Sequence, residues 1–342
     1  MRKLVAAAIA VALLAAVAAA FAAWRVERFM TTPVQVADEG TSFEIVPGSS
    51  FSSVTGDLVD AGFIDDDTWL RLYARWTGEE GGIHAGEYRI ARGATPRTIL
   101  EQFTSGAVQL HSFTIIEGWN HRDLLAALHA HDKIDASMTS EDWPALLAAL
   151  GATQAHPEGL FLPETYRFPR DTSDRELLTQ AYELMQSVLA EEWAAKGDET
   201  PVSTPYEALI LASIVEKETA RADERARIAG VFARRIDKRM RLQTDPTVIY
   251  GIGADFDGNL TRKHLRTDTP YNTYTRRGLP PTPIAMPGRD AIHAVLHPAA
   301  GNELFFVATG LGDGSHKFSA TKAEHDAAVA EYLRRLRQRR NN

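Results

Sequence analysis

The stretch TPYEALILASIVEKET, residues Thr204–Thr219, decides the fold of the larger part of this chain. Thr204 is a favourable N-cap, Pro205 suits the first position of a helix, and Glu207 completes a capping box. No charged residue occurs between Glu207 and Glu216, and a helix that is apolar on every side is usually buried. The sequence therefore predicts a helix inside a domain, with two carboxylates at its C-terminal end.

These two carboxylates, Glu216 and Glu218, lie about 200° apart around the helix axis, so they face different surroundings. Glu218 follows a stripe of large apolar side chains at helical spacing, namely Ile210, Leu211, Ile214 and Val215. Side chains lean towards the N-terminus of their helix, so Glu218 should lie against this stripe, while Glu216 follows a smaller and more polar face. Because desolvation disfavours the charged form, we expect a raised pKa at Glu218, as a general acid near neutral pH requires. The alternative is that both glutamates are solvated at a helix end.

An apolar run covers Leu4–Trp24, which carries no charge and consists largely of Ala, Val and Leu. A helix needs about 20 apolar residues to cross a bilayer, and Arg2 and Lys3 before the run favour a cytoplasmic N-terminus. The alternative is a cleaved signal peptide, whose apolar region is usually only about 7–15 residues long. We therefore expect residues 1–24 to form an uncleaved transmembrane anchor. Under either interpretation the remainder of the chain is exported.

The composition limits what the exported part can be. At 342 residues the chain exceeds one average domain, so two soluble units are expected after the apolar run. The net charge of −8 argues against a nucleic-acid partner. The chain contains no cysteine, which excludes disulfides, thiolate nucleophiles and cysteine-based metal sites.

Apolar patterns divide the exported part into a linker, 25–41, a small unit, 42–113, and a larger unit, 114–342. The small unit has the order strand, helix, helix, strand, with strands predicted at 43–47 and 84–90. This order resembles a LysM-like glycan-binding module, and the alternative is a small α+β spacer without a ligand. The larger unit mixes helices with short strands, so the predicted fold class is α+β.

Two segments of the larger unit combine polar and aromatic residues with a stiff backbone. The segment Leu242–Gly251 begins as a polar-rich loop, and Tyr271–Tyr274 precedes a stretch in which four of the chain's 16 prolines fall between 280 and 287. Prolines keep such a loop extended. Rigid loops with Tyr, Asn and Gln suit a sugar-binding cleft, and the alternative is a long loop wrapped over the core.

Four motifs occur in order along the chain: Pro157–Tyr166 (PEGLFLPETY), Ala212–Thr219 (ASIVEKET), Leu242–Gly251 (LQTDPTVIYG), and Tyr271–Tyr274 with Gly278–Pro281 (YNTY and GLPP). Together they resemble the endolytic murein transglycosylases of the YceG-like family. The resemblance covers nearly the whole chain, including the N-terminal anchor and the LysM-like unit. One departure is Thr282, where the family pattern has Gly, and it concerns the shape of the loop more than the chemistry.

The resemblance implies one catalytic glutamate in the motif ASIVEKET. We assign it to Glu218, in agreement with the apolar stripe, and keep Glu216 as the fallback. Four further residues from the two loop segments are candidates for binding the substrate, with Asp245 orienting the loop: Gln243, Asp245, Tyr271 and Asn272. No metal or other cofactor is expected.

The resemblance also implies a location and a reaction. The chain would be a single-pass protein of the bacterial inner membrane whose catalytic domain faces the periplasm. It would act as a lytic transglycosylase that cuts between N-acetylmuramic acid and N-acetylglucosamine in peptidoglycan strands, endolytically, and leaves 1,6-anhydro ends. Its partners would be glycan strands and peptidoglycan synthases.

Other classes of function compete with this interpretation. A non-catalytic peptidoglycan-binding scaffold would use the LysM-like unit for glycan and the rest for partners. A metal hydrolase could use His293 and His297, which are four residues apart with His316 and His325 nearby in the sequence, but no glutamate follows the first histidine as in the HExxH pattern. A Ser/His/Asp hydrolase lacks support because the chain has no nucleophile-elbow motif.

Overall fold

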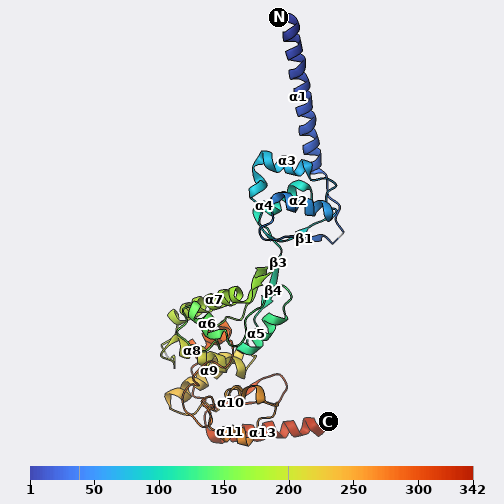
Figure 1. Ribbon diagram of the computed structural model, residues 1–342. Helices are drawn as coiled ribbons and strands as arrows, with labels where there is room; N and C mark the ends of the chain where they lie inside the picture. The colour runs from blue at the N-terminus through green and yellow to red at the C-terminus, as the bar shows by residue number, and fades with distance from the viewer. Residues whose placement is uncertain (38, 199, 342) are drawn as a thin grey trace. The chain divides into compact units, whose positions relative to one another are not determined.

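The computed structural model describes residues 1–37, 39–198 and 200–341. The chain forms two compact units (Figure 1). The first contains Met1–His111 together with Arg167–Asp171, and the second contains Ser112–Tyr166 and Thr172–Asn342. The chain therefore passes between the units more than once, through the strands β3 (Leu110–Thr114) and β5 (Thr165–Pro169), which pair with each other.

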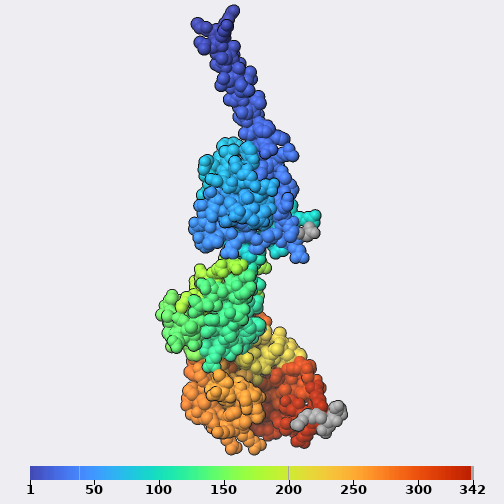
Figure 2. Space-filling model, turned by 45° about the vertical axis from the view of Figure 1, so that its right-hand side comes forward, coloured from blue at the N-terminus to red at the C-terminus, as the bar shows by residue number. Residues whose placement is uncertain are grey.

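The first unit begins with α1 (Arg2–Thr31), the helix within the described residues that is long and apolar enough to cross a membrane. Its apolar part stands clear of the rest of the unit (Figures 1 and 2). The helix does not stop at Trp24, so the segment expected as a linker from residue 25 is helical up to Thr31. Met30 is fully buried, with Val26 and Phe29 packed at the edge of the same core. The last turns of α1 thus belong to the folded unit.

The remaining elements of the first unit are two strands and three helices, with one short 3-10 helix: β1 (Thr41–Ile45), α2 (Phe51–Asp60), α3 (Thr68–Thr77), η1 (Glu79–Gly81), β2 (Gly86–Ile90) and α4 (Pro96–Ser105). β1 and β2 are antiparallel, with Phe43 opposite Tyr88. Alternate residues of each strand face inward, which stacks Phe43 on Phe103 of α4 at 5.5 Å between ring centroids. The strand, helix, helix, strand order expected from the sequence is present.

The second unit is mainly helical, with small two-stranded sheets at its margins. After β3 its elements are α5 (His121–Ala130), β4 (Ile134–Asp135), α6 (Trp143–Ala149), β5, β6 (Thr172–Ser173), α7 (Asp174–Ala194), α8 (Pro205–Glu218), α9 (Ala222–Asp237), α10 (Asp245–Ile252), η2 (Gly253–Asp255), α11 (Arg262–Arg266), α12 (Arg289–Leu296), β7 (Phe305–Ala308), β8 (His316–Ser319) and α13 (Lys322–Asn341). β4 and β6 are parallel, and β7 and β8 are antiparallel.

The helix predicted from TPYEALILASIVEKET is α8, and it lies at the centre of this unit. Every residue from Ala208 to Val215 is buried, and α7, α9, α10 and α12 pack around it. The Thr204 hydroxyl oxygen accepts a hydrogen bond from the Glu207 backbone N–H at 3.1 Å, as predicted. The reciprocal bond differs from a capping box, because the Glu207 carboxylate accepts from the backbone N–H of Ser203 at 2.7 Å.

Three short helices of this unit, α10, α11 and α12, were not expected. α10 occupies the segment that the sequence analysis describes as a polar loop followed by an apolar stretch. A helix of eight residues contains too few turns for its apolar period to stand out. Tertiary packing sustains it instead, because Thr247 and Val248 of α10 are buried and α10 contacts α8.

Candidate active site

Glu218 is the last residue of α8, and its carboxylate accepts a hydrogen bond from the hydroxyl of Thr244. Desolvation raises the pKa of Glu218 to about 6, although the hydrogen bond from Thr244 acts in the opposite direction. The negative charge of Asp245 raises this pKa further, while His316 and Arg235 lower it. The raised pKa agrees with the expectation from the sequence. A carboxyl in this state carries its proton in an appreciable fraction of molecules at pH 6 to 7.

The surroundings that desolvate Glu218 come largely from other elements. Glu218 lines a cavity of about 430 Å³. The side chains that share it come from α9, from the segment around α10, from the Tyr271–Tyr274 motif, from β7 and from α13; they include Arg235, Leu242, Tyr274, Phe305 and His325. The apolar stripe of α8 contributes to the core beneath, where Ile214 and Val215 are fully buried.

Arg235 is the buried cation of this cavity, with 7% of its surface exposed. Its guanidinium donates to the carbonyl oxygens of Leu304 and Leu242, both at 2.6 Å, and lies over the ring of Phe305 at 5.1 Å. Burial lowers the pKa of Arg235. Because its donors are directed at backbone carbonyls, Arg235 fixes the positions of β7 and of the segment that carries Thr244.

Gln243 and Asp245, two of the four residues predicted to bind substrate, line the same cavity as Glu218. Gln243 has a backbone φ of 52°, a left-handed conformation that is uncommon outside glycine. Asp245 begins α10 and accepts a hydrogen bond from the Tyr274 hydroxyl at 2.5 Å. Burial raises the pKa of Tyr274, and the bond to Asp245 raises it further, so Tyr274 stays a hydrogen-bond donor.

Tyr271 and Asn272, the other two candidates, are not among the residues that line this cavity. Asn272 is fully buried, and its amide nitrogen donates to the carbonyl of Thr267 at 2.7 Å as well as to those of His264 and Leu265. The Tyr271 hydroxyl lies 2.9 Å from that of Thr282. Their polar atoms hold the loop in place, so the motif YNTY reaches the cavity through Tyr274.

Glu216, the fallback, occupies a different environment. Desolvation raises its pKa as well, against the effect of a 3.1 Å hydrogen bond from the backbone N–H of Gly288. The guanidinium of Arg225 lies 3.9 Å from its carboxylate. Glu216 and Glu218 both line a second cavity of about 450 Å³, and Glu218 alone reaches the cavity with Gln243 and Asp245.

Sequence reasoning missed three residues of the site, namely Thr244, Tyr274 and Arg235. Thr244 lies in the motif Leu242–Gly251 and Tyr274 in the motif Tyr271–Tyr274, but other residues of these motifs were predicted to bind substrate. Arg235 carried a signal of its own, since it lies three, four and seven residues after Phe232, Val231 and Ile228 on the apolar face of α9. A charged residue on the buried face of a helix indicates a buried charge, and such a charge needs hydrogen-bond or ion-pair partners.

Two clusters among the described residues have the composition of a metal site. The first comprises His121, His156 and Glu158. Glu158 is fully buried, and its carboxylate already lies 2.6 Å from the His121 ring nitrogen and accepts from the Tyr250 hydroxyl at 2.8 Å. His156 accepts the backbone N–H of Glu158 at 3.2 Å. The potential ligand atoms are therefore largely committed to hydrogen bonds.

The second cluster contains His293 and His297 with Glu192. The Glu192 carboxylate lies 2.8 Å from the His293 ring nitrogen and accepts from Arg289 at 2.7 Å. Both ring nitrogens of His297 face carbonyl oxygens, at 3.1 Å and 2.8 Å. A metal-binding imidazole needs a nitrogen lone pair free, which this arrangement does not offer at His297. His316 and His325 belong to neither cluster.

Comparison with known proteins places the chain in a family. The model of the YceG-like family matches residues 43–331. An endolytic murein transglycosylase of Bacillus subtilis is 30% identical over 85% of this chain and 84% of its own length. One of Streptococcus pneumoniae is 26% identical over 84% of this chain and 58% of its own length. A crystal structure of a YceG-like protein from Listeria monocytogenes has 28% identity and a TM-score of 0.52, and covers 85% of this chain and 99% of that one. This chain belongs to the YceG-like family.

Proposed function

We propose that this protein is a lytic transglycosylase of peptidoglycan, with Glu218 as its acid and base. Its relatives named endolytic murein transglycosylase support the reaction class. The observation that carries the assignment of Glu218 is its position, a desolvated carboxyl with a pKa of about 6 that opens onto a cavity also lined by Gln243 and Asp245.

The proposed reaction needs one carboxyl in two protonation states. Protonated Glu218 donates its proton to the glycosidic oxygen between N-acetylmuramic acid and N-acetylglucosamine, and the bond from that oxygen to C1 of the muramic sugar breaks. The Glu218 carboxylate then accepts the proton of the muramic C6 hydroxyl, whose oxygen closes onto C1 as a 1,6-anhydro ring. No water is consumed, and Glu218 ends protonated. Acid and base assistance of this kind contributes about 10²–10⁴-fold to the rate.

The neighbours of Glu218 support both steps. The Thr244 hydroxyl fixes one carboxylate oxygen, which leaves the other for the substrate. The charge of Asp245 raises the pKa of Glu218 and would also stabilise positive charge that develops at C1 in the transition state. Gln243 would bind sugar hydroxyl or acetamido groups at the cavity rim. Tyr271 and Asn272 remain candidates through the loop that they hold.

The product distinguishes this reaction from its rivals. Purified glycan strands are digested with the wild type, Glu218→Gln and Glu216→Gln, and the ends are identified by mass spectrometry. We expect anhydro ends from the wild type, a loss of at least about 100-fold in Glu218→Gln, and a much smaller loss in Glu216→Gln. Full anhydro-product formation by Glu218→Gln would refute the assignment. Reducing ends would instead indicate hydrolysis with Asp245 as a second carboxylate, and no cleavage would indicate a binding scaffold.

The same proposal includes membrane attachment. The apolar part of α1, preceded by Arg2 and Lys3, would span the bacterial inner membrane once, with the cavity-bearing unit in the periplasm. Residues 42–113 would act as a LysM-like glycan-binding domain and 114–342 as the catalytic domain, next to peptidoglycan synthases. Met30, Val26 and Phe29 pack in or against the core of the first unit and lie after the apolar run, so they would stay in place whether or not the run is cleaved. The intact mass of protein extracted from membranes tests whether the helix is retained, because cleavage would remove the mass of the apolar run.

A further inference from the structure

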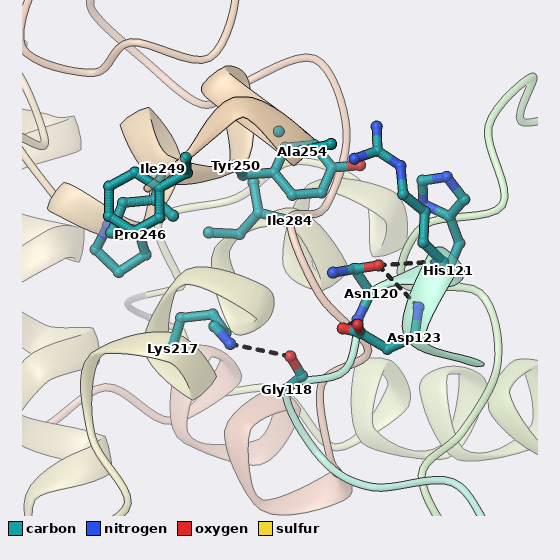
Figure 3. A pocket seen from close by; sticks show the side chains of 13 residues that line it. Gly118, Asn120, His121, Asp123, Lys217, Pro246, Ile249, Tyr250, Ala254 and Ile284 are labelled. Carbon is teal, nitrogen blue, oxygen red and sulfur yellow. Dashed lines mark hydrogen bonds between the residues drawn. The ribbon is translucent and has the colours of Figure 1, made fainter. Parts of the chain in front are cut away.

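A cavity of about 530 Å³ lies between the start of α5, the end of α8 and α10, and the proposed reaction makes no use of it (Figure 3). All its walls belong to the second unit. Lys217 and Asn120 lie on one side of the cavity and Pro246, Ile249 and Tyr250 on the other. Polar and apolar surfaces therefore face each other across one space.

Two cations line this cavity, Arg122 and Lys217, and within the described residues neither forms an ion pair with a carboxylate. Arg122 is exposed and forms no ion pair among the described residues. The Lys217 ammonium donates to the carbonyl of Gly118 at 3.1 Å, a neutral acceptor that leaves its charge uncompensated. Asp123 is the acid of the lining, and one of its oxygens accepts the backbone N–H of Asn120 at 3.0 Å.

The cavity at Gln243 and Asp245 shows the opposite pattern. Its Lys322 is bonded to Asp326, and its Arg235 is directed at backbone carbonyls. Neutral sugars are bound by hydroxyl and amide groups. Two cations without an ion-pair partner, such as Arg122 and Lys217, bind an anionic group better. The two cavities thus favour different parts of a ligand.

The apolar wall of the cavity is rigid. Tyr250 donates its hydroxyl proton to the buried Glu158 at 2.8 Å, and its ring packs on that of Tyr271 at 4.9 Å between centroids. Pro246 has a fixed φ in the first turn of α10. A preformed apolar surface in the same cavity as two cations suits a short, partly extended chain that carries both methyl groups and carboxylates.

The cavity also adjoins the site at Glu218. Gly118 and Lys217 line both this cavity and the cavity of about 450 Å³ that Glu216 and Glu218 line. A branch of a ligand bound at Glu218 that passed Lys217 would reach Arg122. In peptidoglycan the branch of a muramic sugar is the peptide on its lactyl group.

We propose that this cavity binds the peptide branch of the muramic sugar, with Arg122 and Lys217 pairing with its carboxylates and the wall of α10 packing against its apolar atoms. The proposal rests on the proposed function, since it takes peptidoglycan as the substrate. It adds that the enzyme distinguishes peptide-bearing strands from bare ones. Arg122 is then a specificity residue that does not touch the bond being cut.

The test compares two substrates and two readouts in the full chain in detergent micelles. Arg122→Gln is assayed for KM and kcat on peptide-bearing strands and on strands whose peptides have been removed by an amidase. We expect the KM for peptide-bearing strands to rise about fivefold, as for a charge-assisted hydrogen bond that is partly open to water. The KM for bare strands should change by less than about twofold. Arg122→Lys should restore part of the difference, because it keeps the charge and loses the planar fork.

The second readout is independent of catalysis. The disaccharide with and without its peptide is titrated calorimetrically into Glu218→Gln and into the double variant with Arg122→Gln, with Arg262→Gln as a control at an exposed arginine outside these cavities. Weaker binding confined to the peptide-bearing ligand supports the proposal. Equal weakening for both ligands would show that Arg122 binds the lactyl carboxylate or the sugar, not the peptide. No weakening for either ligand would show that Arg122 does not contribute to binding. Both outcomes overturn the proposal. Absence of anhydro product with intact selective binding would refute the proposed function alone.

Discussion

At the scale of single residues, the proton of Glu218 links function to stability. Burial raises the pKa of this carboxyl from 4.5 to about 6, so the folded chain prefers its neutral form more than the unfolded chain does. The stability that the folded chain gains from holding this proton is fully present below about pH 4.5. It is lost as the pH rises through about 6, where Glu218 ionises in the folded chain. Relative to a neutral side chain, Glu218 therefore costs about 2 kcal/mol of stability at pH 8.

Glu218→Gln should accordingly stabilise the fold, and more so at higher pH. Between about pH 4.5 and about pH 8, its advantage over the wild type in free energy of unfolding should grow by about 2 kcal/mol. Urea denaturation of both proteins in detergent at the two pH values measures this. All other titrating groups are shared and cancel to first order, so a constant difference would mean that the carboxyl is not desolvated.

The same pKa sets the pH dependence of catalysis. In the proposed reaction only the protonated form of Glu218 can start the cleavage, so kcat/KM should fall as the pH rises through about 6. The hydrogen bond from Thr244 lowers this pKa, and Thr244→Val should therefore move the falling limb to higher pH, as well as lower the maximum rate. Thr247→Val is the matched control. Its buried hydroxyl bonds to Thr273 and to the carbonyl of Thr244, and not to Glu218, so its loss should leave the falling limb in place. If the falling limb of the pH profile does not shift in Thr244→Val, the Thr244 hydroxyl does not lower the pKa of Glu218.

At the scale of elements, the loop after α11 is fixed by one side chain. The Asn272 amide donates to the backbone carbonyls of His264 and Leu265 in α11 and of Thr267, which follows that helix. Asn272→Ala should lower the free energy of unfolding by about 2–3 kcal/mol, since three carbonyls lose the donor that the buried Asn272 side chain supplies. Asn259→Ala, at an exposed position in the same unit, should change it by less than about 0.5 kcal/mol. Chemical denaturation compares the two variants, and similar values would contradict the role given to Asn272.

Two glycines in helices should respond in opposite ways to substitution by alanine. A Cβ at Gly230 of α9 would lie 2.4 Å from the carbonyl oxygen of Ala299, whereas at Gly56 of α2 nothing lies within 4 Å. Alanine favours a helix over glycine by about 0.5–1 kcal/mol, so Gly56→Ala should stabilise. Gly230→Ala should instead destabilise by about 2 kcal/mol, because backbone must move. Thermal unfolding of both variants gives the two signs, and a stabilising Gly230→Ala would mean that α9 and the chain at Ala299 are not in close contact.

Elements differ in how far the sequence predicts them. α8 was predictable because its cap, its apolar length and its final carboxylates all indicate the same helix. α10 was not, because eight residues with a glycine near the end show no period and rely on α8 for support. The buried role of Asn272 was equally hidden. Its partners are carbonyls five to eight residues earlier, and a backbone acceptor leaves no trace in the residue types.

At the scale of the whole molecule, the motifs predicted which segments meet but not how each contributes. Glu218, Gln243 and Asp245 do line one cavity. The apolar stripe gave the right direction for the pKa of Glu218, yet its immediate walls come from α9, β7 and α13, whose approach to α8 depends on long-range packing. Buried partners such as Arg235 complete the site, and the sequence indicated that residue only through its place on an apolar helical face.

The division of the chain carries a consequence for its biosynthesis. The first unit includes Arg167–Asp171, so it is not finished when residue 111 has been made. During synthesis this unit lacks a part of itself until some sixty further residues have been added to the chain. The first unit can therefore be completed only after the first part of the second unit has been made, and a chain interrupted before residue 167 would carry an incomplete first unit.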